Sequence, residues 1–156
     1  MHLHQPRVPV CISCAGAPPG RLDAVDIPAP LVAECGLTDP AGGLAVARRF
    51  ARVTLTAWAC ATVVDDALLI VTELATNALR HGTGRPVLRL SVGAGHVRIE
   101  VFDDDPAPPV RRPPGADGGW GLVLVERLSL DWGTARHGLG KVVWCALSAP
   151  SAELAG

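Results

Sequence analysis

Glu73 and Asn77 are the residues whose types and spacing best suit chemistry in this chain. They lie in a stretch of helical apolar periodicity that begins at Asp65 and Asp66 and stops at Gly82. Residues four apart on a helix share a face, so the carboxylate and the amide are neighbours. A positioned carboxylate can act as a general base. An isolated pair of this kind is more often the solvated face of an amphipathic helix, and only motifs elsewhere in the chain can favour a site.

Asp103 is the second candidate, because it continues the inward-facing side of a predicted strand. Val97, Ile99 and Val101 alternate on one face of this strand, and Asp103 follows in the same phase. A buried acid is costly unless a donor pairs with it, and an exocyclic amino group of a purine is one suitable donor. The alternative is an acid that starts a turn, which the Asp-Asp-Asp-Pro run favours. The alternation selects Asp103 from this run but does not identify its donor.

A glycine cluster, Gly118-Gly119-Trp120-Gly121-Leu122, ends a proline-rich loop and enters a predicted helix. Glycines in such a place let backbone N–H groups approach phosphate oxygens at the positive end of a helix. Neither a Gly-Lys-Ser/Thr phosphate loop nor the dinucleotide-binding fingerprint occurs. By itself the cluster is more often a tight turn than a phosphate site.

Helices and strands that follow from the apolar periodicity must position these residues. Residues 25–40 are ambiguous: Val25, Ile27 and Leu31 could form a strand, which Pro28 and Pro30 would confine to an edge. The other predicted elements are helices over 44–58, 65–81 and 122–128 and strands over 86–92, 96–103, 129–134 and 141–147. This order predicts an α+β fold, a two-layer α/β sandwich with a mostly antiparallel sheet and helices on one face.

The 156 residues have the size of one domain. We expect a flexible, proline-rich N-terminal tail over residues 1–24, one domain over 25–148 and a C-terminal tail over 149–156. Apolar residues make up 49% of the chain, which excludes a disordered protein. Charged residues interrupt every apolar stretch before it reaches the roughly 18–20 residues of a membrane-spanning helix, so no membrane segment is expected.

Charge and cysteine content narrow the class of partner and the compartment. With 14 basic and 15 acidic residues the net charge is −1, so no nucleic-acid partner is expected. Five scattered cysteines, an odd count, favour a reducing cytoplasm. His2, His4, Cys11 and Cys14 could supply a zinc set, but their order matches no common finger. The apolar composition is compatible with a homodimer and does not decide the oligomeric state.

Taken in chain order, four motifs resemble the GHKL (Bergerat-fold) ATPase superfamily with its histidine kinase-like ATPase domain. They are Glu-Leu-Ala-Thr-Asn-Ala-Leu-Arg-His-Gly at 73–82, Val-Phe-Asp at 101–103, Gly-Gly-Trp-Gly-Leu at 118–122 and Gly-Lys-Val-Val-Trp at 140–144. More narrowly, the chain looks like the small anti-sigma-factor serine/threonine kinase-like proteins of actinobacteria. The resemblance covers residues 25–148, and the box from Glu73 to Asn77 is its most specific part.

The resemblance implies a Bergerat-type ATP site with particular roles. Asn77 would coordinate the Mg²⁺ that bridges the phosphates, and Glu73 would polarise the attacking hydroxyl or water. Asp103 would read the adenine amino group. These residue types are consistent with the roles, since oxygen ligands suit Mg²⁺ and a carboxylate can take a proton.

The glycine cluster would supply the rest of the nucleotide contacts. Gly119 and Gly121 would close a lid over the phosphates, with Leu122 beside them. His81, one helical turn after Asn77, could contact phosphate. A histidine at a helix C-terminus is explained as well by the helix dipole.

The resemblance implies a Mg-ATP-binding regulatory protein, a serine/threonine kinase that binds a sigma factor and phosphorylates an anti-sigma-factor antagonist. Two departures bear on this function. The adenine box of the family, Asp-x-Gly-x-Gly, has neither glycine in Asp103–Ala107, and Val142 stands where the family usually has Thr. They favour an alternative, a non-catalytic nucleotide-responsive binding module. The sequence does not name the partner or decide whether phosphoryl transfer occurs.

Overall fold

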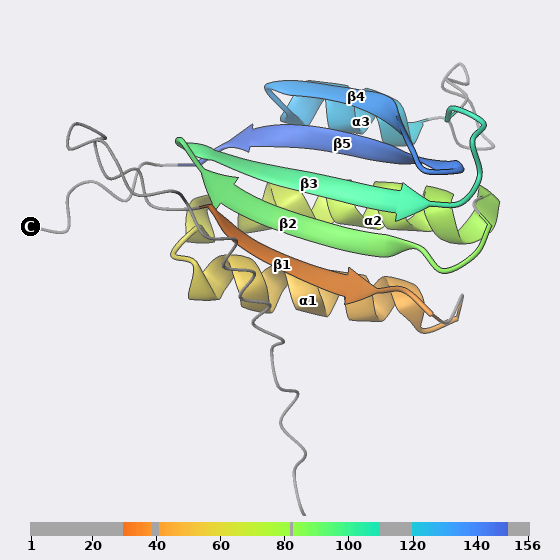
Figure 1. The fold of residues 1–156 in the computed structure, drawn as a ribbon. Coiled ribbons are helices and arrows are strands. Elements are labelled where there is room, and N and C mark those ends of the chain that lie inside the picture. The colour runs from red at the N-terminus through yellow and green to blue at the C-terminus, as the bar shows by residue number, and fades with distance from the viewer. Residues whose placement is uncertain (1–29, 39–40, 82, 110–119, 150–156) are drawn as a thin grey trace, which may run out of the picture.

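The computed structural model describes residues 30–38, 41–81, 83–109 and 120–149. The strands are β1 Leu31–Gly36, β2 Val87–Gly93, β3 His96–Asp103, β4 Asp131–His137 and β5 Gly140–Ser148. The helices are α1 Gly43–Ala57, α2 Val64–His81 and α3 Trp120–Leu128, with a short 3₁₀ helix, η1 Ala61–Val63, before α2. The strands form one antiparallel sheet in the order β1-β2-β3-β5-β4. All three α-helices cover one face of this sheet (Figure 1), which confirms the predicted α+β sandwich.

The predicted elements are present, with small shifts at their ends. The strand that residues 25–40 left open is β1, an edge strand that begins at Leu31, directly after Pro30. Of the residues considered for it, Val25 and Ile27 lie outside the described residues. The tail over residues 1–24 lies outside the described residues. α3 begins at Trp120, two residues before the predicted start, so the end of the glycine cluster belongs to the helix. At the other end of the chain, Ala149 is buried and its N–H donates to the carbonyl of Gly95.

α2 buries an apolar stripe against the sheet and leaves its other side polar, as its periodicity predicts. Asp65 and Asp66 lie in its first turn and Arg80 and His81 in its last, which suits the helix dipole at both ends. Its outer side is tied to α1, because the Arg48 guanidinium donates to the Thr72 hydroxyl at 2.7 Å. α2 therefore contacts both the sheet, through its apolar stripe, and α1, through this hydrogen bond.

The core fills the space between the sheet and the helices. Its largest fully buried side chains include Leu55, Ile70, Leu88, Leu90 and Ile99. Each such side chain stabilises the fold by about 1.5–3 kcal/mol when it leaves water. The helix layer is thereby fixed on the sheet, which sets the position of α2 relative to β3 and β5.

Two glycine-dependent contacts shape the ends of the sheet. The β2–β3 hairpin turns through Ala94 and Gly95, which both have positive φ (51° and 76°), as primed two-residue turns require. At the opposite end, a Cβ on Gly140 would collide with the carbonyl oxygen of Asp103. The start of β5 can lie against the end of β3 only because Gly140 has no side chain.

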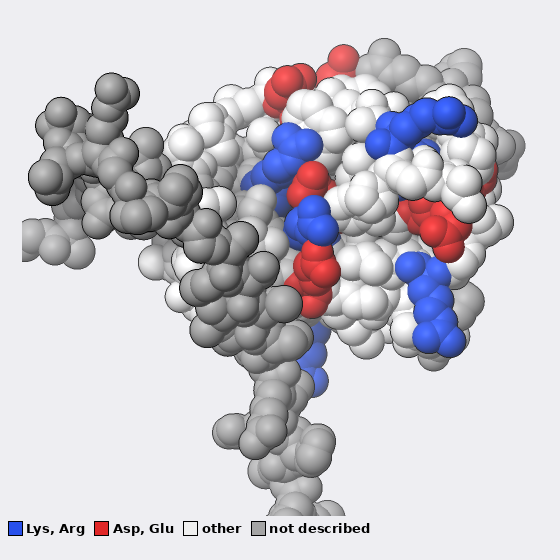
Figure 2. Space-filling view, viewed as in Figure 1, with Lys and Arg blue, Asp and Glu red and all other residues white. Residues whose placement is uncertain are grey.

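The other face of the sheet carries no helix of the described part of the chain. Figure 2 shows basic and acidic side chains alternating in a band across it. The pairs are Arg89 with Glu34 at 2.6 Å and Arg98 with Glu100 at 3.1 Å. The arginines also lie over the rings of Phe102 and Trp144, at 4.7 and 4.3 Å from the ring centroids. These charges compensate one another within the band.

Among the described residues, no helix combines the length and apolar character that a membrane crossing requires.

Candidate functional site

A cavity of about 490 Å³ lies between α2, the first turn of α3 and the adjoining ends of β3 and β5. This volume is in the range of small-ligand sites. The cavity brings together six of the residues that the sequence predicts for the site: Glu73, Asn77, His81, Asp103, Gly121 and Leu122. Gly119, the seventh, lies outside the described residues. Four further polar residues line the cavity: Thr76, Arg80, Asp105 and Lys141.

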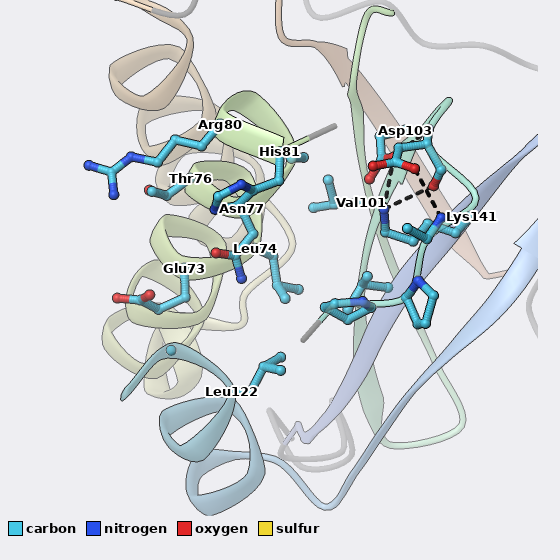
Figure 3. A pocket seen from close by; sticks show the side chains of 17 residues that line it. Glu73, Leu74, Thr76, Asn77, Arg80, His81, Val101, Asp103, Leu122 and Lys141 are labelled. Atoms are coloured by element: carbon cyan, nitrogen blue, oxygen red, sulfur yellow. Dashed lines mark hydrogen bonds and ion pairs between the residues drawn. The ribbon is translucent and has the colours of Figure 1, made fainter. Parts of the chain in front are cut away.

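α2 forms one wall of the cavity. Polar side chains about one helical turn apart on this helix line the cavity. Glu73 and Asn77 are both half-buried, so they belong to the cavity wall and not to a fully solvated helix face. Glu73 and Arg80 point away from Asp103, to the same side of the helix (Figure 3). His81, the last residue of α2, is exposed at the rim.

Asp103 is buried at the end of β3, as the alternation predicts, with 6% of its surface exposed. Its side-chain donor among the described residues is Lys141 of β5, whose Nζ lies 3.0 Å from Asp103 Oδ1. Lys141 Nζ also donates to the Asp105 carbonyl at 2.9 Å (Figure 3). The carboxylate therefore has a buried ion-pair partner, which offsets part of its burial cost.

Sequence reasoning missed Lys141, although a signal was present. The inward-facing residues of β5 are Lys141, Val143, Cys145 and Leu147, a single charge among apolar residues. Val142, singled out from the sequence, pairs with Phe102 and faces the side of the sheet opposite the cavity. A missing hydroxyl at Val142 therefore has no bearing on this cavity, which Lys141 and Val143 of β5 line instead.

The segment after β3 is held by side-chain oxygens and not by glycine flexibility. Asp103 Oδ1 accepts from the backbone N–H of Asp105 at 2.8 Å, and Asp105 Oδ1 accepts from that of Ala107 at 3.0 Å. Such successive Asx turns substitute for backbone hydrogen bonds. Among the described non-glycine residues, positive φ occurs only at Ala59 and Ala94. The two absent box glycines are thus not needed for the conformation that residues 104–109 adopt.

A glycine joins the end of α2 to this segment. Gly84 has φ +78°, and a Cβ on it would collide with the Asp104 carboxylate. The Asp104 N–H donates to the Thr83 carbonyl at 3.0 Å. The chain leaving α2 and the chain leaving β3 are therefore in direct contact beside the cavity.

α3 closes the cavity at the Glu73 side. Gly121, in its first turn, lies against the Glu73 side chain, and Leu122 is buried with 6% of its surface exposed. The backbone N–H groups of the first turn of α3, which have no acceptor within the helix itself, lie near this part of the cavity, and such groups favour anions. One end of the cavity thus combines a helix N-terminus with Glu73, and the other carries the Asp103–Lys141 pair.

Comparisons with known proteins identify the family and agree with the fold. The model of the histidine kinase-like ATPase domain family matches residues 38–147. The fold is similar to a crystal structure of the RsbU and RsbW domains of Rv1364c from Mycobacterium tuberculosis, with a TM-score of 0.57 and 20% identity. That match covers 78% of this chain and 33% of the other. The comparison with curated proteins returned no match.

A second solved structure with similarity is the histidine kinase domain from Erythrobacter litoralis EL346 blue-light activated histidine kinase. It has a TM-score of 0.45 and 27% identity, and the match covers 56% of this chain and 45% of the other. The chain therefore spans a third of the length of the first structure and less than half of the second.

Proposed function

Since this chain belongs to the histidine kinase-like ATPase domain family, we propose that it is a Mg-ATP-binding regulatory protein and a serine/threonine protein kinase of the anti-sigma type. In this proposal ATP occupies the cavity between α2 and the sheet. The observation that carries it is the placement of Glu73, Asn77 and Asp103, from two separate motifs, around that one cavity.

The two ends of the cavity suit the two ends of a nucleotide. Near Glu73 the first turn of α3 offers backbone N–H groups at a positive helix end, which suits phosphates. Arg80, two turns further along α2, adds a positive charge on the side to which Glu73 points. At the other end the buried Asp103 offers an acceptor to the amino group of adenine. His81, Gly121 and Leu122 complete the proposed nucleotide contacts, together with Gly119.

The residues at the cavity fit a magnesium ion that arrives with ATP. Within the described parts of the chain, no three His, Cys, Asp or Glu residues are grouped to hold a metal by themselves. Mg²⁺ is usually held by one or two protein oxygens together with phosphates and waters. Asn77 offers such an oxygen on the cavity wall, and we assign it as the protein ligand. When bound, Mg²⁺ would neutralise charge on the phosphates.

Glu73 is the proposed general base. It would accept the proton of the attacking serine or threonine hydroxyl. The hydroxyl oxygen would bond to the γ-phosphorus while the bond from that phosphorus to the ADP oxygen breaks. Half-burial against α3 limits the orientations of the carboxylate, which favours such positioning.

The proposed protein partners are a sigma factor and an anti-sigma-factor antagonist, as the motif resemblance suggests. A second candidate function is a non-catalytic module whose partner affinity responds to nucleotide. The engagement of Asp103 Oδ1 by Lys141 favours it, because an acid that is already paired makes weaker use of the adenine amino group.

Calorimetric titration with Mg-ATP tests the binding, and transfer from γ-labelled ATP to candidate antagonist proteins of the same genome tests the chemistry. We expect Glu73→Gln to bind Mg-ATP like the wild type and to transfer no label. Asp65→Asn, the same change of group at an exposed position in the first turn of α2, should leave binding and transfer unchanged.

Three outcomes separate the possibilities. Transfer by the wild type and by Asp65→Asn alone supports the kinase. Binding by all three proteins without transfer by any supports the binding module. A wild-type protein that binds no Mg-ATP at millimolar concentration contradicts both.

A further inference from the structure

Lys141 is a buried charge in the cavity wall, and the function proposed above assigns it no contact with the nucleotide. Its side chain is 11% exposed and that of Asp103 is 3% exposed, and both line the cavity. Lysine is among the residues least often buried, so a lysine at the wall of a ligand cavity calls for a reason beyond packing. A fold needs no ion pair at this place, because an apolar pair of similar volume is often as stable.

The donors and acceptors of the pair are only partly used within the protein. An ammonium group has three N–H donors, and Lys141 directs two of them to Asp103 Oδ1 and the Asp105 carbonyl. Asp103 Oδ1 accepts from Lys141 and from the Asp105 N–H, and the described contacts leave Oδ2 for another donor. The cavity is thus lined, side by side, by a carboxylate that accepts and an ammonium that donates.

A carboxylate alone and a carboxylate beside an ammonium select different purines. The 6-amino group of adenine donates to a carboxylate, whereas the 6-oxo group of guanine or hypoxanthine would face it with a lone pair and be repelled. An adjacent ammonium can donate to the 6-oxo group, while the carboxylate accepts from the protonated ring nitrogen at position 1. With adenine the two side chains exchange partners: the carboxylate accepts from the 6-amino group, and the ammonium donates to the unprotonated ring nitrogen at position 1.

We propose that Lys141 reads the purine edge together with Asp103, so that the site takes 6-oxo purine nucleotides alongside ATP. This inference rests on the proposed nucleotide site and adds its base selectivity. Lys141 is then a specificity-determining residue that contacts the base directly.

The test compares Kd values of Mg-ATP and Mg-ITP, which differ in the groups at positions 6 and 1 of the base. For the wild type we expect the two Kd values to agree within about tenfold. In Lys141→Met, Mg-ITP should weaken by about tenfold or more beyond any weakening of Mg-ATP, because the loss of a charged donor leaves the oxo group against a carboxylate. Lys141→Arg, which keeps charge and donors, should restore much of the Mg-ITP binding.

Arg136→Met is the matched control. Arg136 pairs with Lys141 from β4, is exposed and does not line the cavity. The ratio of the Kd of Mg-ITP to that of Mg-ATP should therefore be the same in Arg136→Met as in the wild type. The wild-type comparison needs no variant, so it tests the base selectivity of the site even where Lys141→Met does not fold.

The outcomes distinguish this inference from the proposed function. If the wild type binds Mg-ATP but rejects Mg-ITP by several hundredfold, the base selectivity inferred here is wrong and the ATP site stands. If the ratio of the two Kd values is unchanged in a folded Lys141→Met protein, the inference is also wrong, and the Asp103–Lys141 ion pair has only a structural role. A protein that binds neither nucleotide overturns both proposals.

Discussion

Gly121 lies directly against the carboxylate of Glu73. A Cβ at position 121 would stand 2.5 Å from Glu73 Oε2 and 3.4 Å from its Cδ. Since α3 begins only one residue earlier, the first turn of this helix rests on the side chain proposed as the base. The orientation of Glu73 therefore depends on a residue of another motif that has no side chain of its own.

Gly121→Ala should separate stability from phosphoryl transfer. Alanine in a helix is favoured over glycine by about 1 kcal/mol, so the melting temperature should hold or rise. The new methyl group displaces the Glu73 carboxylate, and misplacement of a catalytic group costs about tenfold or more in rate. Thermal unfolding and the rate of label transfer from ATP measure the two effects.

Gly43→Ala is the control for this change. Gly43 likewise lies in the first turn of a helix packed on α2, but its Cβ would meet Leu79 Cδ1 at 3.3 Å, outside the cavity. Its transfer rate should equal that of the wild type. Equal transfer rates in Gly121→Ala and the wild type would show that the position of Glu73 does not depend on Gly121.

Gly84→Ala should destabilise the fold more than its backbone angle alone explains. A left-handed φ costs a non-glycine residue about 1–2 kcal/mol, and here the Cβ also meets Asp104. Gly95→Ala isolates the angle, because Gly95 has φ +76° with nothing within 4 Å of the added atom. Denaturant unfolding should give Gly84→Ala the larger loss. Equal losses would mean that Asp104 moves away at no cost.

Asp103 and Lys141 should be energetically coupled. Lys141→Met leaves a buried carboxylate without its cation, and Asp103→Asn leaves a buried ammonium without its anion. Each single change should cost about 1–3 kcal/mol, and the double variant should cost less than their sum. The free energy of unfolding of the four proteins measures the coupling. Additive losses would show that the ion pair contributes nothing to the fold.

Cys145 should make the protein less stable in alkali. Burial raises the pKa of its thiol to about 12 from the usual 9.0, although a backbone hydrogen bond at Ile99 and the charge of Arg98 oppose the rise. The folded state thus holds this proton at a pH where the unfolded chain releases it. The stabilisation is complete below pH 9 and is lost as pH rises from 9 toward 12.

The comparison with Cys145→Ala isolates this effect, since other groups also titrate in that range. The difference in free energy of unfolding between the wild type and the variant should shrink steadily above pH 9. A difference that stays constant to pH 11 would contradict the shifted thiol.

The α+β fold and most of the candidate site could be predicted because they depend on local patterns. Alternation along β3 placed Asp103 on the buried face, and the helical spacing placed Glu73 and Asn77 on one wall. Both patterns follow from periods of two and of about 3.6 residues, which the sequence displays directly. β1 lies at an edge of the sheet, as expected for a strand near Pro28 and Pro30, but its ladder begins only after Pro30.

The sequence by itself thus determined which residues could do chemistry and which elements carry them. Only the tertiary structure decided what those residues touch. The register of β5 against β3 turns Lys141 toward Asp103 and Val142 away, and a shift of one residue would reverse that choice. The packing of α3 on α2 likewise decides that Gly121 meets Glu73. Such contacts join residues far apart in the chain, and no local period specifies their register.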